Sequence, residues 1–236
     1  RYERMPTRVF ESEYHGAQHV ADVICRMIRN HVDNASARDI YEELPPFVLG
    51  LTTGRTPLGL YRELVKRHKA GEVSFKSVAV YSLDEFYPIR RTEQQRRNFR
   101  IHEEFLEYVN VRPENTFIPD PSVPVEKVSQ YCRDYEAKIA EMGGMDLMLL
   151  GMGAKGQIGF NEAGSYSNSK TRMVALSNAS IKEEASAFAG AENVPTKAIT
   201  MGIGTILAAK EIVLVAWGED KASVVGQVIE GAIDPM

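Results

Sequence analysis

Three short segments of the sequence combine glycine, hydroxyl, cationic and carboxylate side chains at spacings that could support chemistry on a small anion. The first follows an apolar run and consists of Thr52, Thr53, Gly54, Arg55 and Thr56. Small residues let backbone N–H groups approach an anion, a helix start favours negative charge, and Arg55 adds a cation. The segment predicts phosphate binding, although ordinary capping of a tight strand-to-helix turn explains the same residues. Its spacing matches neither the Walker A motif nor the GxGxxG motif of nucleotide-binding proteins, so nucleotide binding is the weaker interpretation.

The second segment places two adjacent carboxylates, Asp84 and Glu85, at the end of an apolar run and directly before Phe86. A carboxylate at the end of a strand, beside an aromatic ring, is well placed to act as a general base. A helix cap or a surface ion pair explains this pair of residues equally well.

The third segment, residues 150–165, is rich in glycine and also contains apolar side chains. A loop that faces only solvent does not need Ile158 and Phe160, so we interpret it as a constrained loop. Its central part carries Gly153, Lys155 and Gln157.

The hydrophobic pattern indicates the scaffold that must bring these segments together. Short apolar or β-branched runs, typical of strands, alternate with amphipathic stretches, typical of helices. We expect strands at 7–10, 47–51, 77–83, 146–150, 173–176, 198–201 and 212–217. We expect helices at about 15–31, 57–69, 98–109, 125–142, 179–188, 205–209 and 220–230.

This alternation predicts an α/β, Rossmann-like fold, in which a doubly wound, mostly parallel sheet carries helices on both faces. Ligands bind outside the carboxyl ends of such strands, so the loops after Leu51, Leu83 and Leu150 are expected to share one site. No internal repeat divides the chain, which we interpret as one domain over residues 1–236. Because the sequence lacks an initial methionine and stops just after a helical pattern, we expect it to be part of a longer polypeptide.

Composition argues against several classes of protein. A net charge of −4 over 236 residues does not favour nucleic-acid binding. The basic stretch that includes Arg96, Arg97 and Arg100 is interleaved with polar residues and is interpreted as a solvated helix face. The sequence contains no apolar run long enough for a membrane helix and no signal-peptide core, so we expect a cytoplasmic protein without a membrane partner. Cys25 and Cys132 show no metal-binding spacing.

Four ordered motifs resemble the successive signatures of the glucosamine-6-phosphate deaminase/isomerase family, whose superfamily also holds 6-phosphogluconolactonases. They lie at residues 53–58, 83–86, 151–162 and 194–205. The similarity runs from about Thr7 to the end of the chain. The lactonases lack the Phe160-Asn161-Glu162 continuation, which favours the deaminases.

The resemblance implies that the chain, as a homo-oligomer, binds a phosphorylated amino sugar. The implied reaction converts glucosamine 6-phosphate to fructose 6-phosphate and ammonia without a metal or organic cofactor. By position, Asp84 matches the aspartate that shuttles a proton, and Glu162 matches the glutamate that supports the ring-opening group. The implied phosphate contacts are Thr52, Thr53, Gly54, Arg55, Thr56, Gly153 and Lys197.

The sequence departs from the family in the third segment, where Lys155 and Gln157 replace the family's aspartate and histidine. The histidine opens the sugar ring, and glutamine cannot give or take a proton at neutral pH. Lys155 is either a replacement acid or a solvated surface charge. On the phosphate side, Ile181 and Thr196 stand where the family's arginine and lysine are expected. The chain is therefore either a deaminase or a sugar-phosphate-binding relative with weakened catalysis, and a lactonase is less favoured.

Overall fold

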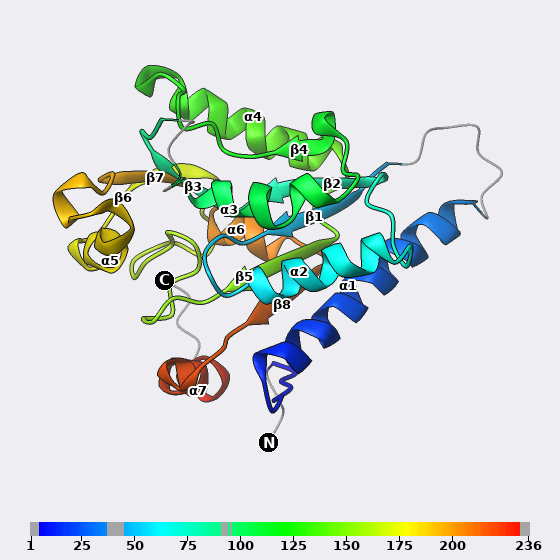
Figure 1. Cartoon of the computed structure of the whole chain (residues 1–236). Helices are drawn as coiled ribbons and strands as arrows, with labels where there is room; N and C mark the ends of the chain where they lie inside the picture. The colour runs from blue at the N-terminus through cyan, green and yellow to red at the C-terminus, as the bar shows by residue number, and fades with distance from the viewer. Residues whose placement is uncertain (1–4, 37–44, 91–93, 95, 232–236) are drawn as a thin grey trace.

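Five short strands form a parallel central sheet in the order β4-β2-β1-β5-β8 (Figure 1). The structure is a computed structural model that describes residues 5–36, 45–90, 94 and 96–231. The strands are β1 (Phe47–Leu51), β2 (Val78–Ser82), β4 (Thr116–Phe117), β5 (Leu147–Gly151) and β8 (Glu211–Val215). Alternate residues of β1 point to opposite faces, and every one of them is buried, as expected for a strand covered on both sides.

Helices cover both faces of this sheet (Figure 1). On one face, Leu49 of β1 packs in a cluster with Ile24 of α1 (Glu13–Ser36), Leu64 of α2 (Leu58–Lys69) and Ile101 of α3 (Arg97–Glu104). On the other face, Val48 belongs to the cluster that contains apolar residues of α4 (Val128–Glu141) and α6 (Ile203–Leu207). The remaining helices are α5 (Asn178–Glu184) and α7 (Ala222–Glu230). Short 3-10 turns cover Leu106–Tyr108, Pro113–Asn115, Val125–Lys127, Ala185–Phe188, Ala191–Asn193 and Glu219–Lys221.

A second, smaller sheet stands beside the first and is antiparallel, in the order β3-β7-β6. It consists of β3 (Asp84–Tyr87), β6 (Arg172–Ala175) and β7 (Lys197–Thr200). Leu83 joins the two sheets, since its N–H donates to the carbonyl of Leu51 at 2.9 Å and its carbonyl accepts from the N–H of Met201 at 2.9 Å. The chain thus leaves the carboxyl end of β2 and enters the second sheet at once.

The predicted α/β class with a Rossmann-like parallel sheet is confirmed, with three differences in detail. The strand expected at 7–10 does not form, and Val9 is 93% exposed, so this segment finds no sheet to join. The strands expected near 173–176 and 198–201 lie in the antiparallel sheet. Asp84 and Glu85, expected in a loop, lie in β3, where Asp84 pairs with Thr200. Within the described residues, no helix is long and apolar enough to cross a membrane.

Candidate active site

A cleft of about 920 Å³ lies where the three segments singled out in the sequence converge. Residues of the loop after β1, the glycine-rich loop after β5, α3 and α5 line its walls. In Figure 1, helix α5 and the glycine-rich loop that follows β5 both lie on the left. Of the predicted site residues, Thr52, Thr53, Gly54, Arg55, Thr56, Gly153 and Gln157 line the cleft. This is the expected edge, outside the carboxyl ends of parallel strands.

The loop after β1 is held in place by neighbouring aromatic side chains. Tyr61 donates its hydroxyl proton to the carbonyl of Thr52 at 2.5 Å, and the indole N–H of Trp217 donates to the carbonyl of Thr56 at 2.9 Å. Arg55 is exposed at the cleft. No side chain in the described part of the chain caps the start of α2, and the N–H of its first residue, Leu58, donates to the carbonyl of Arg55 at 3.2 Å.

The carboxylate of Asp84 is fully buried behind the wall of the cleft. Its Oδ1 accepts a hydrogen bond from the hydroxyl of Thr53 at 2.7 Å and lies 3.1 Å from Nε of Arg97. Its Oδ2 is buried and has no hydrogen-bond partner among the described residues. This oxygen lies beside Gly159, where an added Cβ would be 3.0 Å away from it. An unsatisfied buried carboxylate oxygen is costly and leaves Oδ2 as the oxygen with free capacity to accept a proton.

Arg97, at the start of α3, connects the separate walls of the cleft. Its Nε donates to the hydroxyl of Thr53 at 2.8 Å, and its Nη1 donates to Oε1 of Glu184 on α5 at 2.8 Å. Its guanidinium lies over the ring of Phe160, 4.6 Å from the centroid. Burial lowers the pKa of Arg97, but the carboxylates of Asp84 and Glu184 outweigh it and raise this pKa above its usual value. Arg97 was expected on a solvated helix face and not as a site residue, because a run of arginines carries no signal that distinguishes a mostly buried member.

Glu85 serves to anchor α3. Its Oε1 accepts the backbone N–H of Arg97 at 2.9 Å, and its Oε2 accepts Nδ2 of Asn98 at 3.0 Å and Nε of Arg96 at 3.3 Å. Burial raises the pKa of Glu85, and the hydrogen bonds from Asn98 and Arg97 offset part of the rise. Glu85 therefore caps α3 and also forms an ion pair with Arg96, but it is buried and not at the surface.

Gln157 lies in the cleft with its amide fixed on both sides. Its Oε1 accepts the backbone N–H of Lys155 at 3.0 Å, and its Nε2 donates to Oε2 of Glu183 at 3.3 Å. The amide sits over Gly153, since an added Cβ there would be 2.1 Å from the Cδ of Gln157. Glu183, on α5, lines the same cleft. Glu183 was not among the residues predicted from the sequence, because a glutamate on an amphipathic helix is ordinarily a solvated residue.

Glu162 contacts α5 and not residue 157. Its Oε1 accepts hydrogen bonds from the hydroxyls of Ser177, at 3.1 Å, and Ser180. Ser177 is the N-cap of α5 and accepts the backbone N–H of Ser180 at 3.2 Å. Glu162 therefore holds the start of the helix that carries Glu183, while its own carboxylate lies outside the residues that line the cleft.

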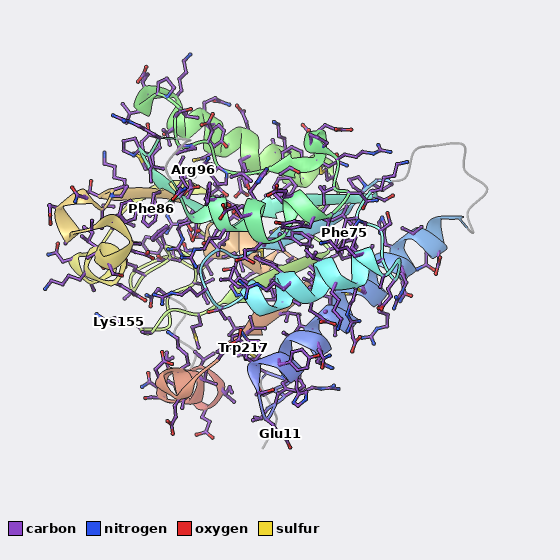
Figure 2. All side chains as sticks on the ribbon, in the orientation of Figure 1. Glu11, Phe75, Phe86, Arg96, Lys155 and Trp217 are labelled. Carbon is purple, nitrogen blue, oxygen red and sulfur yellow. The ribbon has the colours of Figure 1, made fainter. Side chains whose placement is uncertain are left out.

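Two predicted site residues, Lys155 and Lys197, lie away from the cleft. So does Ile181, which stands where the family's arginine is expected. Lys155 is exposed, and its side chain projects from the tip of the glycine-rich loop, away from the body of the molecule (Figure 2). Lys197 is exposed at the start of β7, at the opposite end of that strand from Thr200. Ile181 packs in an apolar cluster with Phe86 and Phe160. Of the three, none lines the cleft.

The described residues contain no group of three or more histidine, cysteine, aspartate or glutamate side chains that could hold a metal ion. Among the described residues that line the cleft are the carboxylates of Glu183, Glu184 and Asp220, the amide of Gln157, four arginines and Lys221, and the buried carboxylate of Asp84 lies behind the wall. Together they can bind an anion and move protons.

Curated relatives cover most of the chain. A glucosamine-6-phosphate deaminase-like protein of Bacteroides thetaiotaomicron is 38% identical over 234 residues, which are 99% of this chain. The chain spans only 34% of the length of that relative. A glucosamine-6-phosphate deaminase of Thermoanaerobacter sp. is 40% identical over 192 residues, covering 81% of this chain and 75% of the relative.

Solved structures and a family model agree with these matches. A structure described as a monomeric glucosamine-6-phosphate deaminase superposes with a TM-score of 0.86 at 32% identity, over 98% of this chain and 90% of the other. A 6-phosphogluconolactonase of Leishmania guyanensis shares the fold, with a TM-score of 0.71 at 21% identity over 98% and 89% of the two chains. The family model described as glucosamine-6-phosphate isomerases/6-phosphogluconolactonase matches residues 15–236. The chain belongs to this family.

Proposed function

We propose that the chain is an amino-sugar-phosphate deaminase/isomerase, which converts glucosamine 6-phosphate to fructose 6-phosphate and ammonia. The observation that carries the proposal is the buried carboxylate of Asp84, with one oxygen unpartnered among the described residues, behind a cleft lined by the loop after β1. Relatives about 40% identical that are named glucosamine-6-phosphate deaminase support the same activity.

The phosphate of the sugar would bind at the loop after β1. Gly54, Arg55 and Thr56 line the cleft just before α2, where the start of the helix favours negative charge. The hydroxyl of Thr53 is already engaged by Asp84 and Arg97, so it links the phosphate loop to the base. Lys155 and Lys197 receive no part in the proposal, because both side chains are exposed outside the cleft.

Oδ2 of Asp84 would act as the base. With the sugar ring open, it takes the proton from C2 and returns it to C1, while a second proton passes from the C2 nitrogen of the sugar to O1. C1 becomes a CH₂OH group and C2 an imine. Water then adds to the imine, and ammonia leaves. Thr53 and Arg97 engage Oδ1 and Oδ2 is buried, so a bound sugar reaches Oδ2 only if groups packed around that oxygen move.

Gln157 supports a second candidate function, a sugar-phosphate-binding relative whose catalysis is weakened. An amide cannot replace the proton transfers of the family's histidine. General acid–base groups contribute about 10²–10⁴-fold to rate, so a chain without any substitute would turn over slowly. The lactonase activity known from other members of the family has less support, because the Phe160-Asn161-Glu162 motif matches the deaminases.

A coupled assay of ammonia release from glucosamine 6-phosphate tests the proposal. We expect turnover by the unaltered chain, and we expect Asp84→Asn to abolish it while calorimetry still detects binding. Glu192→Gln, which alters an exposed carboxylate outside the cleft, should leave turnover unchanged. Binding without ammonia release by the unaltered chain would support the binding relative. Equal affinity for glucosamine and its 6-phosphate would refute both candidates.

A further inference from the structure

The chain lacks the histidine that the family resemblance assigns to ring opening, yet a titratable group does lie against the residue at that position. This group is Glu183, whose Oε2 accepts a hydrogen bond from Nε2 of Gln157 at 3.3 Å. Both residues line the cleft, whereas Lys155 does not. The carboxylate beside residue 157 is thus not Glu162, whose oxygen is engaged by Ser177 and Ser180.

The orientation of the Gln157 amide follows from its partners. Its Oε1 accepts the backbone N–H of Lys155, so a flipped amide would place its NH₂ group against that N–H and its oxygen against a carboxylate. The observed orientation is therefore strongly preferred, and the amide presents a donor to Glu183. Gly153 makes this possible, because any Cβ at that position would overlap the amide.

Of the neighbouring carboxylates Glu183 and Glu184, Glu183 is the one without an ion pair among the described residues. The next residue, Glu184, accepts a hydrogen bond from Nη1 of Arg97 at 2.8 Å. In contrast, no described residue donates a hydrogen bond to Oε1 of Glu183, whose side chain is exposed to the cleft. The third carboxylate at the cleft, Asp220, forms an ion pair with Lys221 at 3.5 Å.

Arg97 links Asp84 to the helix that carries Glu183. A single guanidinium, that of Arg97, contacts Asp84 through Nε at 3.1 Å and Glu184 through Nη1, so α5 and β3 face each other closely. A hexose with C2 at Asp84 carries C1 one bond further on, together with the hydroxyl O1 and the ring oxygen O5. Those two oxygens are the atoms between which a proton must move when the ring opens.

We propose that Glu183 is the acid–base residue that opens the sugar ring, with Gln157 as the residue that positions it; this inference rests on the proposed function. The Glu183 carboxylate takes the proton of O1 as the C1=O1 double bond forms and the C1–O5 bond breaks. It then gives the same proton to O5. One proton moves from O1 to O5, Glu183 ends as it began, and no further reactant is needed.

Anomer exchange in an Asp84→Asn background isolates this step, since the substitution should block deamination and leave ring opening. We expect the Asp84→Asn protein to speed the exchange between α- and β-glucosamine 6-phosphate, measured by NMR saturation transfer. Adding Glu183→Gln should lower this protein-dependent rate at least about 10²-fold with unchanged affinity in calorimetry. Adding Glu183→Asp, which keeps the acid, should restore part of the rate. Glu192→Gln and Lys155→Gln, each added to the same background, should have no effect.

The outcomes separate the two proposals. Binding of glucosamine 6-phosphate with an exchange rate that does not depend on Glu183 would overturn the role of Glu183 and leave the proposed function standing. A rate that falls only in Lys155→Gln would also overturn it and assign the step to the lysine. Absence of binding would refute the proposed function, and with it the role of Glu183.

Discussion

At the scale of single residues, the cleft is organised around the guanidinium of Arg97. It contacts Thr53 of the first loop, Asp84 of β3, Phe160 of the third loop and Glu184 of α5. Asp84 is fully buried and the side chain of Arg97 is only 18% exposed, so this pair is little screened by water. Removing the cation would leave an uncompensated buried charge, which is among the costliest single changes in a protein.

We therefore expect Arg97→Met to lower the free energy of unfolding by about 3–5 kcal/mol. In Asp84→Asn, Arg97 keeps its contact with Glu184. The variant that combines Arg97→Met with Asp84→Asn should lose about 1–3 kcal/mol less unfolding free energy than the sum of the losses in the two single variants. Urea unfolding measures all of these values. Arg62→Met is the control: its ion pair with Glu104 has side chains 65% and 30% exposed, so it should cost under about 1 kcal/mol. Losses that simply add would contradict the coupling of Arg97 to Asp84.

At the scale of elements, two helices that wall the cleft each begin on a buried or half-buried carboxylate. Glu85 of β3 accepts backbone N–H groups at the start of α3, and Glu162 of the third loop accepts hydroxyls at the start of α5. Negative charge is favourable at a helix N-terminus. The positions of Arg97 and Glu183 in the cleft thus depend on carboxylates that do not line it.

The titration of Glu85 gives this anchor a pH signature. Because burial raises its folded-state pKa, its contribution to stability is fully present below the unfolded-state value, about 4.3, and falls as the pH rises through the folded-state pKa. The difference in unfolding free energy between the unaltered chain and Glu85→Gln should therefore shrink from about pH 4 towards pH 7.

Glu104→Gln provides a control of opposite sign. The hydrogen bond from Arg62 lowers the pKa of Glu104, so its contribution is present above the unfolded-state pKa and is lost as the pH falls through the folded-state pKa. The difference in unfolding free energy between the unaltered chain and Glu104→Gln should grow from acid to neutral pH. If the free-energy differences for Glu85→Gln and Glu104→Gln changed in the same direction with pH, the raised pKa of Glu85 would be contradicted.

At the scale of the whole molecule, a chain with net charge −4 gathers cations at its cleft. Arg55, Arg97, Arg100 and Lys221 all line it. Such a local excess of positive charge attracts anionic ligands and weakens with salt. The homo-oligomer expected from the family stays a prediction, and the related structure with 32% identity is described as monomeric.

Binding at this cleft should stabilise the whole chain, because the described lining comes from the loops after β1 and β5 and from the helices around the second sheet. Glucosamine 6-phosphate at about 100 times its Kd should add about 2.7 kcal/mol to the free energy of unfolding, and so raise Tm. Arg55→Ala should reduce the rise in Tm at a fixed ligand concentration. Arg133→Ala, on the exposed face of α4, should not. Equal rises in both variants would place the phosphate elsewhere.

The sequence by itself determined the features that depend on local pattern. Apolar runs of about five residues predicted β1 and β5, and amphipathic spacing predicted α1, α2 and α4. Turn chemistry after Leu51 predicted the loop that lines the cleft, including Thr53 and Arg55. These properties are set by neighbours along the chain, so they can be read without knowing the fold.

The tertiary structure decided which side chains meet. Gln157 and Glu183 are 26 residues apart, and Arg97 and Glu184 are 87 apart, yet each pair is hydrogen-bonded. Nothing local distinguishes Glu183 from Glu184, or Arg97 from Arg100. Only the packing of α3 and α5 fixes which glutamate contacts Gln157 and which arginine contacts Asp84. The same holds for Lys155, whose exposure follows from the path of the loop. Local pattern located the loops, whereas long-range packing selected the groups that can exchange protons within them.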